Sequence, residues 1–337
     1  GGALSGDGLR PVILTPGDPA GVGAEISLLA FAAGMRGFML MEDPDRLAGI
    51  ASALDLSIEI KSLDAPEPLA HDHAFLPVMP LQWTERPVAG KGDPRNAEVI
   101  IASIRKAATM AQDGTAAAIV TNPINKAILK DAGFSHPGHT EFLASLAPAR
   151  PGAPLMMLAG ESLRVVPATV HIALRDVPAA LTTDGIVAKG RLLNEALQLY
   201  FGCGSPRIAV CGLNPHAGEN GQFGDEDQRV IAPAVEALKD EGIGAFGPLS
   251  ADTLFHPEAR ETYDAAIGMY HDQVLIPLKT IDFDGGVNVT LGLDFIRTSP
   301  DHGTAFDIAG TGKARPQSLM AAIRMARMMA SRRHPDG

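Results

Sequence analysis

Short apolar runs rich in β-branched residues alternate along the whole chain with longer stretches of helical periodicity, and no other feature limits the fold as strongly. This alternation predicts an α/β protein. The expected strands are residues 11–15, 38–41, 116–121, 165–171, 207–211 and 265–270. The expected helices are residues 23–33, 183–201, 225–241 and 316–329, with a long helix that begins at Asp93 and Pro94 and ends near Gly114.

Prolines indicate how the chain is divided. Pro148, Pro151 and Pro154 interrupt its middle and predict a hinge between two lobes. We expect the lobe boundary near 135–154, with the C-terminal segment returning to the first lobe. Residues 61–86 carry several prolines and the single tryptophan, Trp83, and are interpreted as a lobe edge or an excursion loop.

Charge and composition exclude several classes of protein. The chain has 28 Lys and Arg against 39 Asp and Glu, a net charge of −11, and shows no basic stripe, so nucleic acid is not an expected partner. No apolar run reaches the roughly 18 residues of a membrane span. Cys203 and Cys211 lack the spacing of metal ligands and indicate a reducing compartment. Residues 1–10 lack the pattern of a secretion signal, so we expect a cytoplasmic protein with no membrane partner.

Three of the ten histidines share one setting. His171, His216 and His271 each lie at, or just beyond, the carboxyl end of a predicted buried strand, where open α/β sheets form their ligand crevice. Three imidazoles from separate strand ends can bind one divalent metal and leave coordination positions open for a substrate. For any one of these histidines alone, a structural role is the simpler interpretation.

Two further segments offer groups that bind anions. Thr140 lies where a helix is expected to begin and either caps that helix or donates its hydroxyl to an oxyanion. Lys279, Asn288 and Arg297 suit a phosphate or a carboxylate, with solvated surface cations as the alternative. The Gly/Pro-rich loop at residues 15–23 fits neither a Walker nor a G-x-G-x-x-G pattern and is interpreted as a tight strand–helix turn. No G-x-S-x-G elbow occurs, so a serine or cysteine hydrolase has no support.

Five ordered motifs together resemble one enzyme family. The chain from about Pro11 to about Ala326 strongly resembles the 4-hydroxythreonine-4-phosphate dehydrogenase family of vitamin B6 biosynthesis. The motifs are residues 17–21 (GDPAG), 138–141 (GHTE), 214–218 (NPHAG), 270–273 (YHDQ) and the long block 288–310.

The resemblance implies a two-lobed α/β/α fold like that of isocitrate and isopropylmalate dehydrogenases, in a single family domain over residues 10–330. It also implies a homodimer whose active site lies in the inter-lobe cleft and takes residues from both subunits. The family's metal ligands fall on His171, His216 and His271. Its substrate-binding residues and supporting aspartates fall on His139, Thr140, Lys279, Asn288, Arg297, Asp252 and Asp272.

The loop His302–Gly310 resembles the adenosine-binding loop of NAD-dependent members of the wider superfamily. The resemblance assigns His302, Gly303, Asp307 and Ile308 to the cofactor. A carboxylate at Asp307 can accept a hydrogen bond from the ribose 2′-hydroxyl but repels a 2′-phosphate, which favours NAD over NADP. Imidazole ligands suit zinc best, with magnesium and cobalt as alternatives.

The expected reaction is the oxidation of 4-phosphooxy-L-threonine at its 3-hydroxyl, followed by decarboxylation to 3-amino-2-oxopropyl phosphate. Asp272 is expected to fix the tautomer of a neighbouring histidine, whereas His139 either contacts the substrate or relays a proton. The same chemistry on threonate or erythronate 4-phosphate, or on a terephthalate-derived dihydrodiol, is the nearest alternative. A metal-dependent hydrolase or lyase without nicotinamide is a second alternative, but it would leave the loop His302–Gly310 unexplained. A pure binding module is a third, and it would leave the three histidines unexplained.

Overall fold

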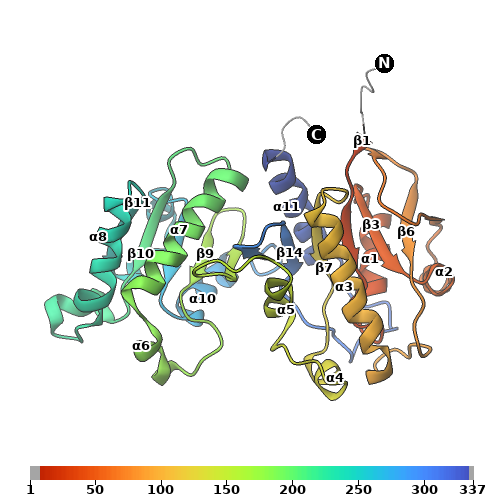
Figure 1. Cartoon of the computed structure of the whole chain (residues 1–337), viewed down its shortest axis with the longest axis horizontal. Helices are drawn as coiled ribbons and strands as arrows, with labels where there is room; N and C mark the ends of the chain where they lie inside the picture. Colours follow the sequence, from red (N-terminus) through yellow and green to blue (C-terminus); the bar gives the residue numbers. More distant parts are fainter. Residues whose placement is uncertain (1–7, 334–337) are drawn as a thin grey trace. The chain divides into compact units, whose positions relative to one another are not determined.

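The structure, a computed structural model, describes residues 8–333, so residues 1–7 and 334–337 lie outside it. The expectation that no secretion signal is present falls mostly on the undescribed residues 1–7. The described chain forms two compact units: residues 8–148 with 293–333 make unit 1, and residues 149–292 make unit 2. In each unit helices pack on a β-sheet (Figure 1), which confirms the predicted α/β class.

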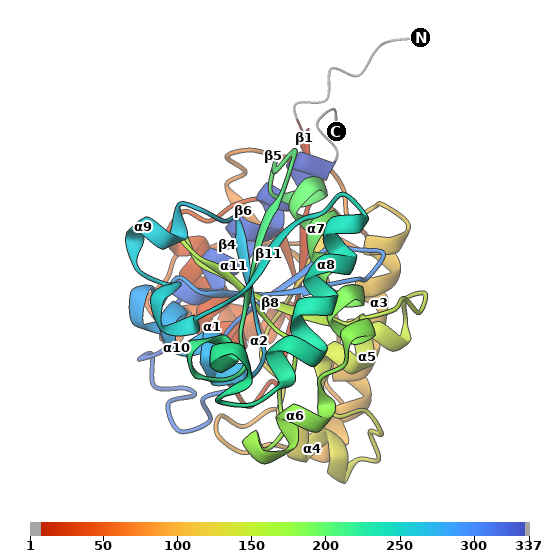
Figure 2. The same ribbon diagram turned by 90° about the vertical axis from the view of Figure 1, so that its left-hand side faces the viewer.

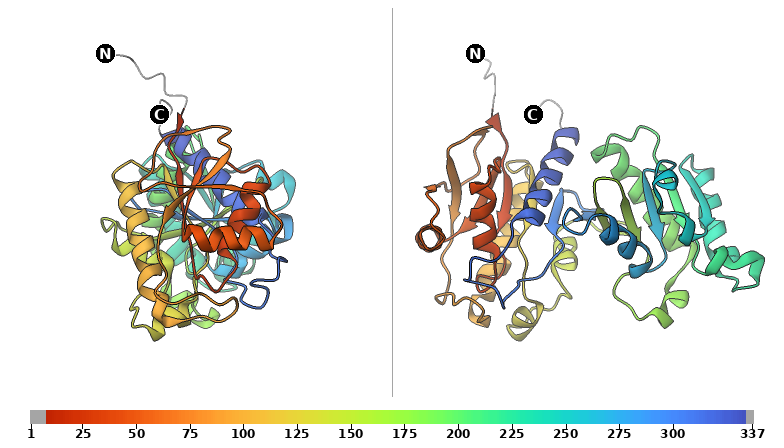
Figure 3. Two further views of the ribbon diagram at one scale, coloured as in Figure 1. Left: turned by 90° about the vertical axis from the view of Figure 1, so that its right-hand side faces the viewer. Right: turned by 180° about the vertical axis from the view of Figure 1, so that it is seen from behind.

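The sheet of unit 1 is parallel throughout. Its strand order is β14 (Arg297–Pro300), β7 (Ala118–Thr121), β2 (Val12–Thr15), β3 (Phe38–Glu42), β6 (Phe75–Pro80) and β4 (Glu59–Ser62). Helix α3 (Ala97–Gln112) covers one face, and α1 (Gly23–Ala32) and α11 (Gln317–Arg333) cover the other (Figures 1 and 3). Every residue of β2, β3 and β7 is buried, as a strand covered on both faces requires.

Helix α3 shows how local sequence sets an element. The Asp93 carboxylate accepts a hydrogen bond from the Arg95 backbone N–H, and Pro94 opens a short 3-10 turn, η1 (Pro94–Asn96), that leads into the helix. Within α3, Ile100, Ile104 and Ala107 recur at helical spacing and are buried in the core that also contains Ile13 and Ile119 of the sheet. The predicted start of this helix is therefore confirmed.

Residues 61–86 are not only an excursion loop, as the sequence suggested. Strand β6 is inserted between β3 and β4, and a two-residue strand β5 (Leu69–Ala70) pairs with β1 (Gly8–Leu9). Pro77 and Pro80 concealed β6, because proline removes a backbone donor and is rare inside sheets. Leu76, Val78 and Met79 are nevertheless buried, and their burial favours the strand.

The sheet of unit 2 has the order β11 (Gly244–Leu249), β10 (Arg207–Cys211), β12 (Ala265–Gly268), β9 (Arg164–Pro167), β8 (Leu155–Ala159) and β13 (Val287–Leu291). The strands from β11 to β9 are parallel, whereas β8 runs antiparallel to both β9 and β13. Helices α7 (Thr183–Tyr200) and α8 (Ala232–Asp240) lie on one side of β11, and α10 (His271–Ile281) lies on the other (Figure 2).

Three predicted elements of unit 2 end or begin differently. The strand expected over 165–171 ends at Pro167, and the strand expected over 265–270 ends at Gly268. The helix expected over 225–241 starts as a π-helical turn, η4 (Asp227–Ile231), before α8. The remaining described helices and turns are α2 (Pro44–Ala53), α4 (Lys126–Asp131), α5 (His139–Ser145), η2 (Leu174–Asp176), α6 (Val177–Ala180), η3 (Pro215–Gly221), η5 (Ala251–Thr253) and α9 (Pro257–Arg260). Between residues 8 and 333, no helix is both long and apolar enough to cross a bilayer.

Candidate active site

The three histidines lie beyond the carboxyl ends of neighbouring parallel strands in unit 2. His171 follows β9, His271 is the first residue of α10 after β12, and His216 lies in turn η3 after β10. Strand β12 is hydrogen-bonded to β9 on one side and to β10 on the other. The three connecting loops therefore leave the same edge of the sheet, where α/β proteins bind ligands.

His171 and His271 lie close together. Their ring centroids are 5.8 Å apart, and both line a cavity of about 300 Å³. Two imidazoles on one zinc ion place their centroids roughly 5–6 Å apart, because each Zn–N bond is about 2.1 Å long. Asp272 Oδ1 lies 2.6 Å from His271 Nδ1. A proton on that nitrogen leaves Nε2 with a lone pair, so this pair of imidazoles offers two of the donors that a divalent metal needs.

His216 has a different environment. Its Nδ1 lies 2.7 Å from Glu219 Oε2, and it lines a separate cavity of about 670 Å³ together with Asp252 and Asp272. In the described part of the chain, no three or more His, Cys, Asp or Glu side chains are arranged to hold a metal ion. The structure thus brings His171 and His271 together and leaves His216 outside that pair.

The turn that carries His216 is left-handed. His216, Ala217, Glu219 and Asn220 have φ values of 53°, 51°, 44° and 55°. For a residue with a Cβ atom, this conformation costs roughly 1–2 kcal/mol. Such strain persists only where surrounding contacts impose it, and it concentrates at functional sites. It falls here on one of the candidate metal ligands.

The other predicted residues of unit 2 lie on three elements. Asp252 is in η5, where its carboxylate accepts a hydrogen bond from the Ser250 hydroxyl. Lys279 is in the last turn of α10, and Asn288 is the second residue of β13. Both side chains are half-buried.

In unit 1, Arg297 is buried among hydroxyl groups. It is the first residue of β14 and is only 3% exposed. Its Nη2 donates to the Thr121 hydroxyl at 2.9 Å, and its Nη1 donates to the Thr140 hydroxyl at 3.2 Å. Burial lowers the pKa of the Arg297 guanidinium to about 10, and the charge of Glu141 offsets part of that effect. The group is therefore charged at neutral pH.

His139 opens α5 beside this group, and its Nε2 is buried without a hydrogen-bond partner. Burial lowers the pKa of His139 well below its usual range, and the positive charges of Arg297 and Lys126 lower it further. The imidazole is therefore neutral at pH 7. A buried guanidinium and two hydroxyls together suit an anionic group such as a phosphate, and the unsatisfied imidazole nitrogen leaves one further hydrogen-bonding position beside them.

The predicted cofactor loop also lies in unit 1. His302, Gly303 and Asp307 are exposed and Ile308 is half-buried. The end of the loop is held by Glu25, a buried residue of α1, whose carboxylate accepts hydrogen bonds from the backbone N–H groups of Gly310 and Gly312. Sequence reasoning missed Glu25, since a lone glutamate in a helix carries no signal for such a contact.

The first Gly/Pro-rich loop is more than a turn. Val22 donates its backbone N–H to the Thr304 carbonyl at 3.1 Å, so the loop holds the cofactor segment. A Cβ atom on Gly21 would lie 2.8 Å from that same oxygen, which explains the glycine.

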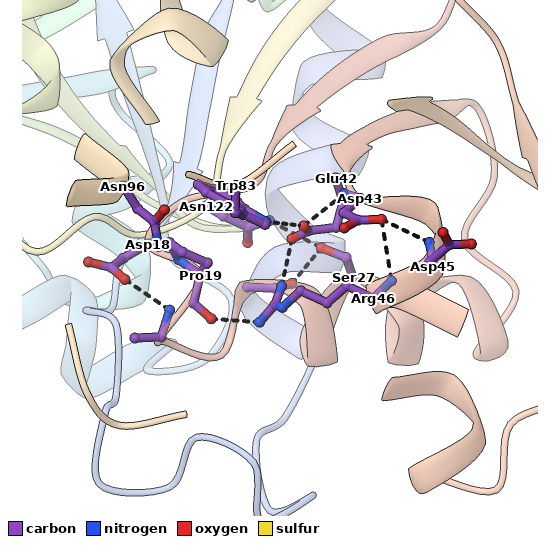
Figure 4. A network of polar contacts seen from close by, with 12 residues as sticks. Asp18, Pro19, Ser27, Glu42, Asp43, Asp45, Arg46, Trp83, Asn96 and Asn122 are labelled. Carbon is purple, nitrogen blue, oxygen red and sulfur yellow. Dashed lines mark hydrogen bonds and ion pairs between the residues drawn. The ribbon is translucent and has the colours of Figure 1, made fainter. Parts of the chain in front are cut away.

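A polar network also holds the Gly/Pro-rich loop of residues 15–23, at the carbonyl of Pro19 (Figure 4). Arg46 donates to the Pro19 carbonyl at 2.7 Å and to Glu42 Oε2 at 2.9 Å, and Trp83 Nε1 donates to Glu42 Oε1 at 2.6 Å. Burial raises the pKa of the Glu42 carboxyl, and the positive charge of Arg46 opposes that shift. Each Glu42 oxygen accepts at least one hydrogen bond, so we assign Glu42 a structural role.

Comparison with known proteins gives one consistent result. A family model described as pyridoxal phosphate biosynthetic protein PdxA matches residues 35–326. A 4-hydroxythreonine-4-phosphate dehydrogenase of Xanthobacter autotrophicus is 51% identical over 328 residues, which is 95% of this chain and 93% of that protein.

Solved structures of an enzyme with that same name and of a different dehydrogenase are also similar to this chain. The crystal structure of a Klebsiella pneumoniae 4-hydroxythreonine-4-phosphate dehydrogenase is similar with a TM-score of 0.87 and 38% identity, covering 95% of this chain and 98% of that one. A terephthalate 1,2-cis-dihydrodiol dehydrogenase from Burkholderia xenovorans is similar with a TM-score of 0.67 and 28% identity, covering 94% and 97%.

Proposed function

Because this chain belongs to the PdxA family of pyridoxal phosphate biosynthetic proteins, we propose that it is the oxidoreductase that acts on 4-hydroxythreonine 4-phosphate. The proposed reaction oxidises the 3-hydroxyl to 2-amino-3-oxo-4-phosphooxybutanoate, which then loses carbon dioxide to give 3-amino-2-oxopropyl phosphate. The observation that carries the proposal is the buried Arg297, with its two threonine partners, in a chain about half identical to dehydrogenases of this phosphorylated substrate.

Arg297 and Thr140 are assigned to the phosphate, with Lys279 and Asn288 as further substrate-binding residues. A guanidinium can form two parallel hydrogen bonds to a phosphate. Burial lowers the pKa of Arg297 because the charged guanidinium is desolvated, and a bound anion would offset that desolvation cost. His139, neutral and with a free ring nitrogen, is suited to accept a hydrogen bond from the substrate. Phosphate binding remote from the reacting carbon orients that carbon for reaction.

His171, His216 and His271 are assigned to a divalent metal, zinc before magnesium or cobalt. When bound, the metal would lower the pKa of the substrate hydroxyl and NAD would accept the hydride. The chain's own contribution is to present imidazole nitrogens, and Asp272 Oδ1 at 2.6 Å from His271 Nδ1 favours the tautomer that can ligate through Nε2. Asp252 stays a candidate supporting carboxylate beside His216.

NAD is the proposed cofactor, with NADP as the alternative. Asp307 is exposed on the loop that resembles an adenosine-binding loop, so its carboxylate is available to a ribose hydroxyl. Glu25 and the first loop fix the backbone of this segment before the cofactor arrives.

A homodimer that shares its active sites is also proposed. Around the histidines, unit 2 exposes large apolar side chains: Ile172 is 44% exposed, Leu174 67% and Ile276 61%. Ile172 and Leu174 line the cavity of His171, and Ile276 lines that of His216. Large exposed apolar side chains are more frequent at interaction surfaces than elsewhere on a protein. A second copy there could supply the ligand that completes each metal centre.

The same chemistry on another substrate is the second candidate, favoured by the likeness to the terephthalate dihydrodiol dehydrogenase. Reduction of NAD should be followed with 4-hydroxythreonine 4-phosphate, with threonate and erythronate 4-phosphates and with the dihydrodiol dicarboxylate, each before and after treatment with a chelator. We expect the amino-acid phosphate to give the highest kcat/KM, and the chelator to abolish turnover. Turnover of the dihydrodiol alone, or full activity after chelation, would contradict the proposal.

A further inference from the structure

Gln273 belongs to the YHDQ motif but takes no part in the proposed binding of metal or substrate. It lies in the first turn of α10, two residues after His271, and is half-buried. Its Oε1 accepts a hydrogen bond from the Met269 backbone N–H at 2.7 Å, and its Nε2 donates to the Gly212 carbonyl at 2.8 Å. One amide therefore joins the segment after β12 to the segment after β10.

The third strand end is joined to the same point. Thr169, which follows β9 and is buried, donates its hydroxyl to the Met269 carbonyl at 2.7 Å. Met269 thus uses both backbone groups: its carbonyl accepts from Thr169 in the loop of His171, and its N–H donates to Gln273, whose Nε2 in turn donates to Gly212 in the segment before His216.

Asp227 continues these contacts into the left-handed turn. This carboxylate is 1% exposed and is the first residue of η4. Its Oδ1 accepts from the Leu213 backbone N–H at 2.8 Å, and its Oδ2 accepts from Asn214 Nδ2 at 3.0 Å. A Cβ atom on Gly212 would lie 2.6 Å from Asp227 Oδ1, so the carboxylate and the backbone are packed tightly together. The strained turn begins directly after these two anchored residues.

We propose that Gln273 and Asp227 are positioning residues: they hold the segments that follow β12 and β10, which carry His271 and His216, in a fixed arrangement and impose the left-handed turn on His216. The proposal rests on the assignment of those histidines as metal ligands. Neither side chain need touch the metal or the substrate. Each acts through the backbone, because side chains on a strained turn keep one direction only while the turn's anchors hold.

The test compares Gln273→Met, which keeps the length of the side chain but removes both hydrogen bonds, with Asp227→Asn, which places an N–H where an acceptor is needed. Gln198→Met is the matched control, since this exposed glutamine on α7 donates to a glycine carbonyl elsewhere in unit 2. Zn²⁺ affinity is measured by competition with a chelating indicator, ligand geometry is followed by the Co²⁺ absorption spectrum, and backbone hydrogen exchange over residues 212–220 is measured without metal.

We expect both variants to bind Zn²⁺ about 10–100-fold more weakly, with an altered Co²⁺ spectrum and faster exchange over 212–220, while the control behaves as the wild type. A Gln273→Met protein with wild-type affinity, spectrum and exchange would overturn the proposal. If circular dichroism shows that Asp227→Asn does not fold, the affinity, spectrum and exchange of Gln273→Met still test the proposal. If the wild type binds no metal, the proposed function fails, whereas the exchange measurement in metal-free protein still decides the positioning role.

Discussion

Replacing Arg297 with methionine tests the phosphate site through stability as well as catalysis. Burial lowers the pKa of this guanidinium to about 10, against about 12.5 for a free arginine, and at about 1.4 kcal/mol per unit the charged group costs the folded protein about 3 kcal/mol. Both pKa values lie well above 7, so the group is charged in the folded and unfolded states and the cost is fully present at neutral pH. Methionine removes that cost.

The substitution also removes the hydrogen bonds to Thr121 and Thr140, each of which contributes at least about 1.5 kcal/mol because the donor is charged. The two effects oppose each other. We therefore expect the free energy of unfolding of the unliganded Arg297→Met protein to lie within about 2 kcal/mol of the wild type, although a buried charged side chain has been lost.

Ligand binding separates the two proteins. At a concentration about 100 times its Kd, 4-hydroxythreonine 4-phosphate should stabilise the wild type by about 2.7 kcal/mol, or about 5–10 °C in Tm for a unit of this size. The variant should show little shift, and neither protein should respond strongly to unphosphorylated 4-hydroxythreonine. Circular dichroism melting curves measure this, with Arg324→Met, an exposed arginine on α11, as the control. Equal stabilisation of the variant by the phosphorylated ligand, or an equal loss of NAD affinity, would refute the assignment.

Three further substitutions test the remaining assignments. His216→Ala should abolish both metal retention, measured by elemental analysis, and turnover; full activity of the wild type after chelation would contradict the metal role. Asp307→Lys should lower or reverse the preference for NAD over NADP in kcat/KM, and an unchanged ratio would mean that the loop has been misassigned. Burial lowers the pKa of His139, so below pH about 6.5 the unfolded chain binds a proton that the folded protein does not. The free energy of unfolding should therefore fall as the pH drops, by up to about 1.4 kcal/mol per pH unit from this group. In His139→Gln, denaturant titrations from pH 7 to pH 5 should lose that part of the slope; an unchanged slope would show that His139 is not buried in its neutral form.

Elements whose boundaries depend on local chemistry were predicted closely. Strand β10 was predicted residue for residue, because a continuous apolar run is what a strand covered on both faces requires. The Asp93–Pro94 start of the long helix depends on two adjacent residues and was also correct. Strand β6 was missed because its two prolines carry the local signal of a loop, whereas burial between β3 and β4 determines the outcome.

The candidate site likewise has features that the sequence predicted and features that it did not. Strand ends could be read from the sequence, so His171, His216 and His271 could be placed at one edge of a sheet. The left-handed turn could not be predicted, since Ala217 and Glu219 have no preference for positive φ and only the contacts of the tertiary structure impose it. Glu25, Asp227 and Gln273 were missed for a related reason. Each forms hydrogen bonds with backbone groups of a loop that is not adjacent in the sequence, and no local pattern indicates such a contact.

The sequence alone therefore determined the α/β class, most buried strands and the chemical type of each candidate group, because these follow from apolar periodicity and from side-chain chemistry near in the chain. Only the tertiary structure decided that His171 and His271 are paired while His216 faces another cavity, and that Arg297 lies buried against Thr121 and Thr140. These are contacts between residues up to 176 positions apart. Packing between segments distant in the sequence selects them, and no local pattern encodes them.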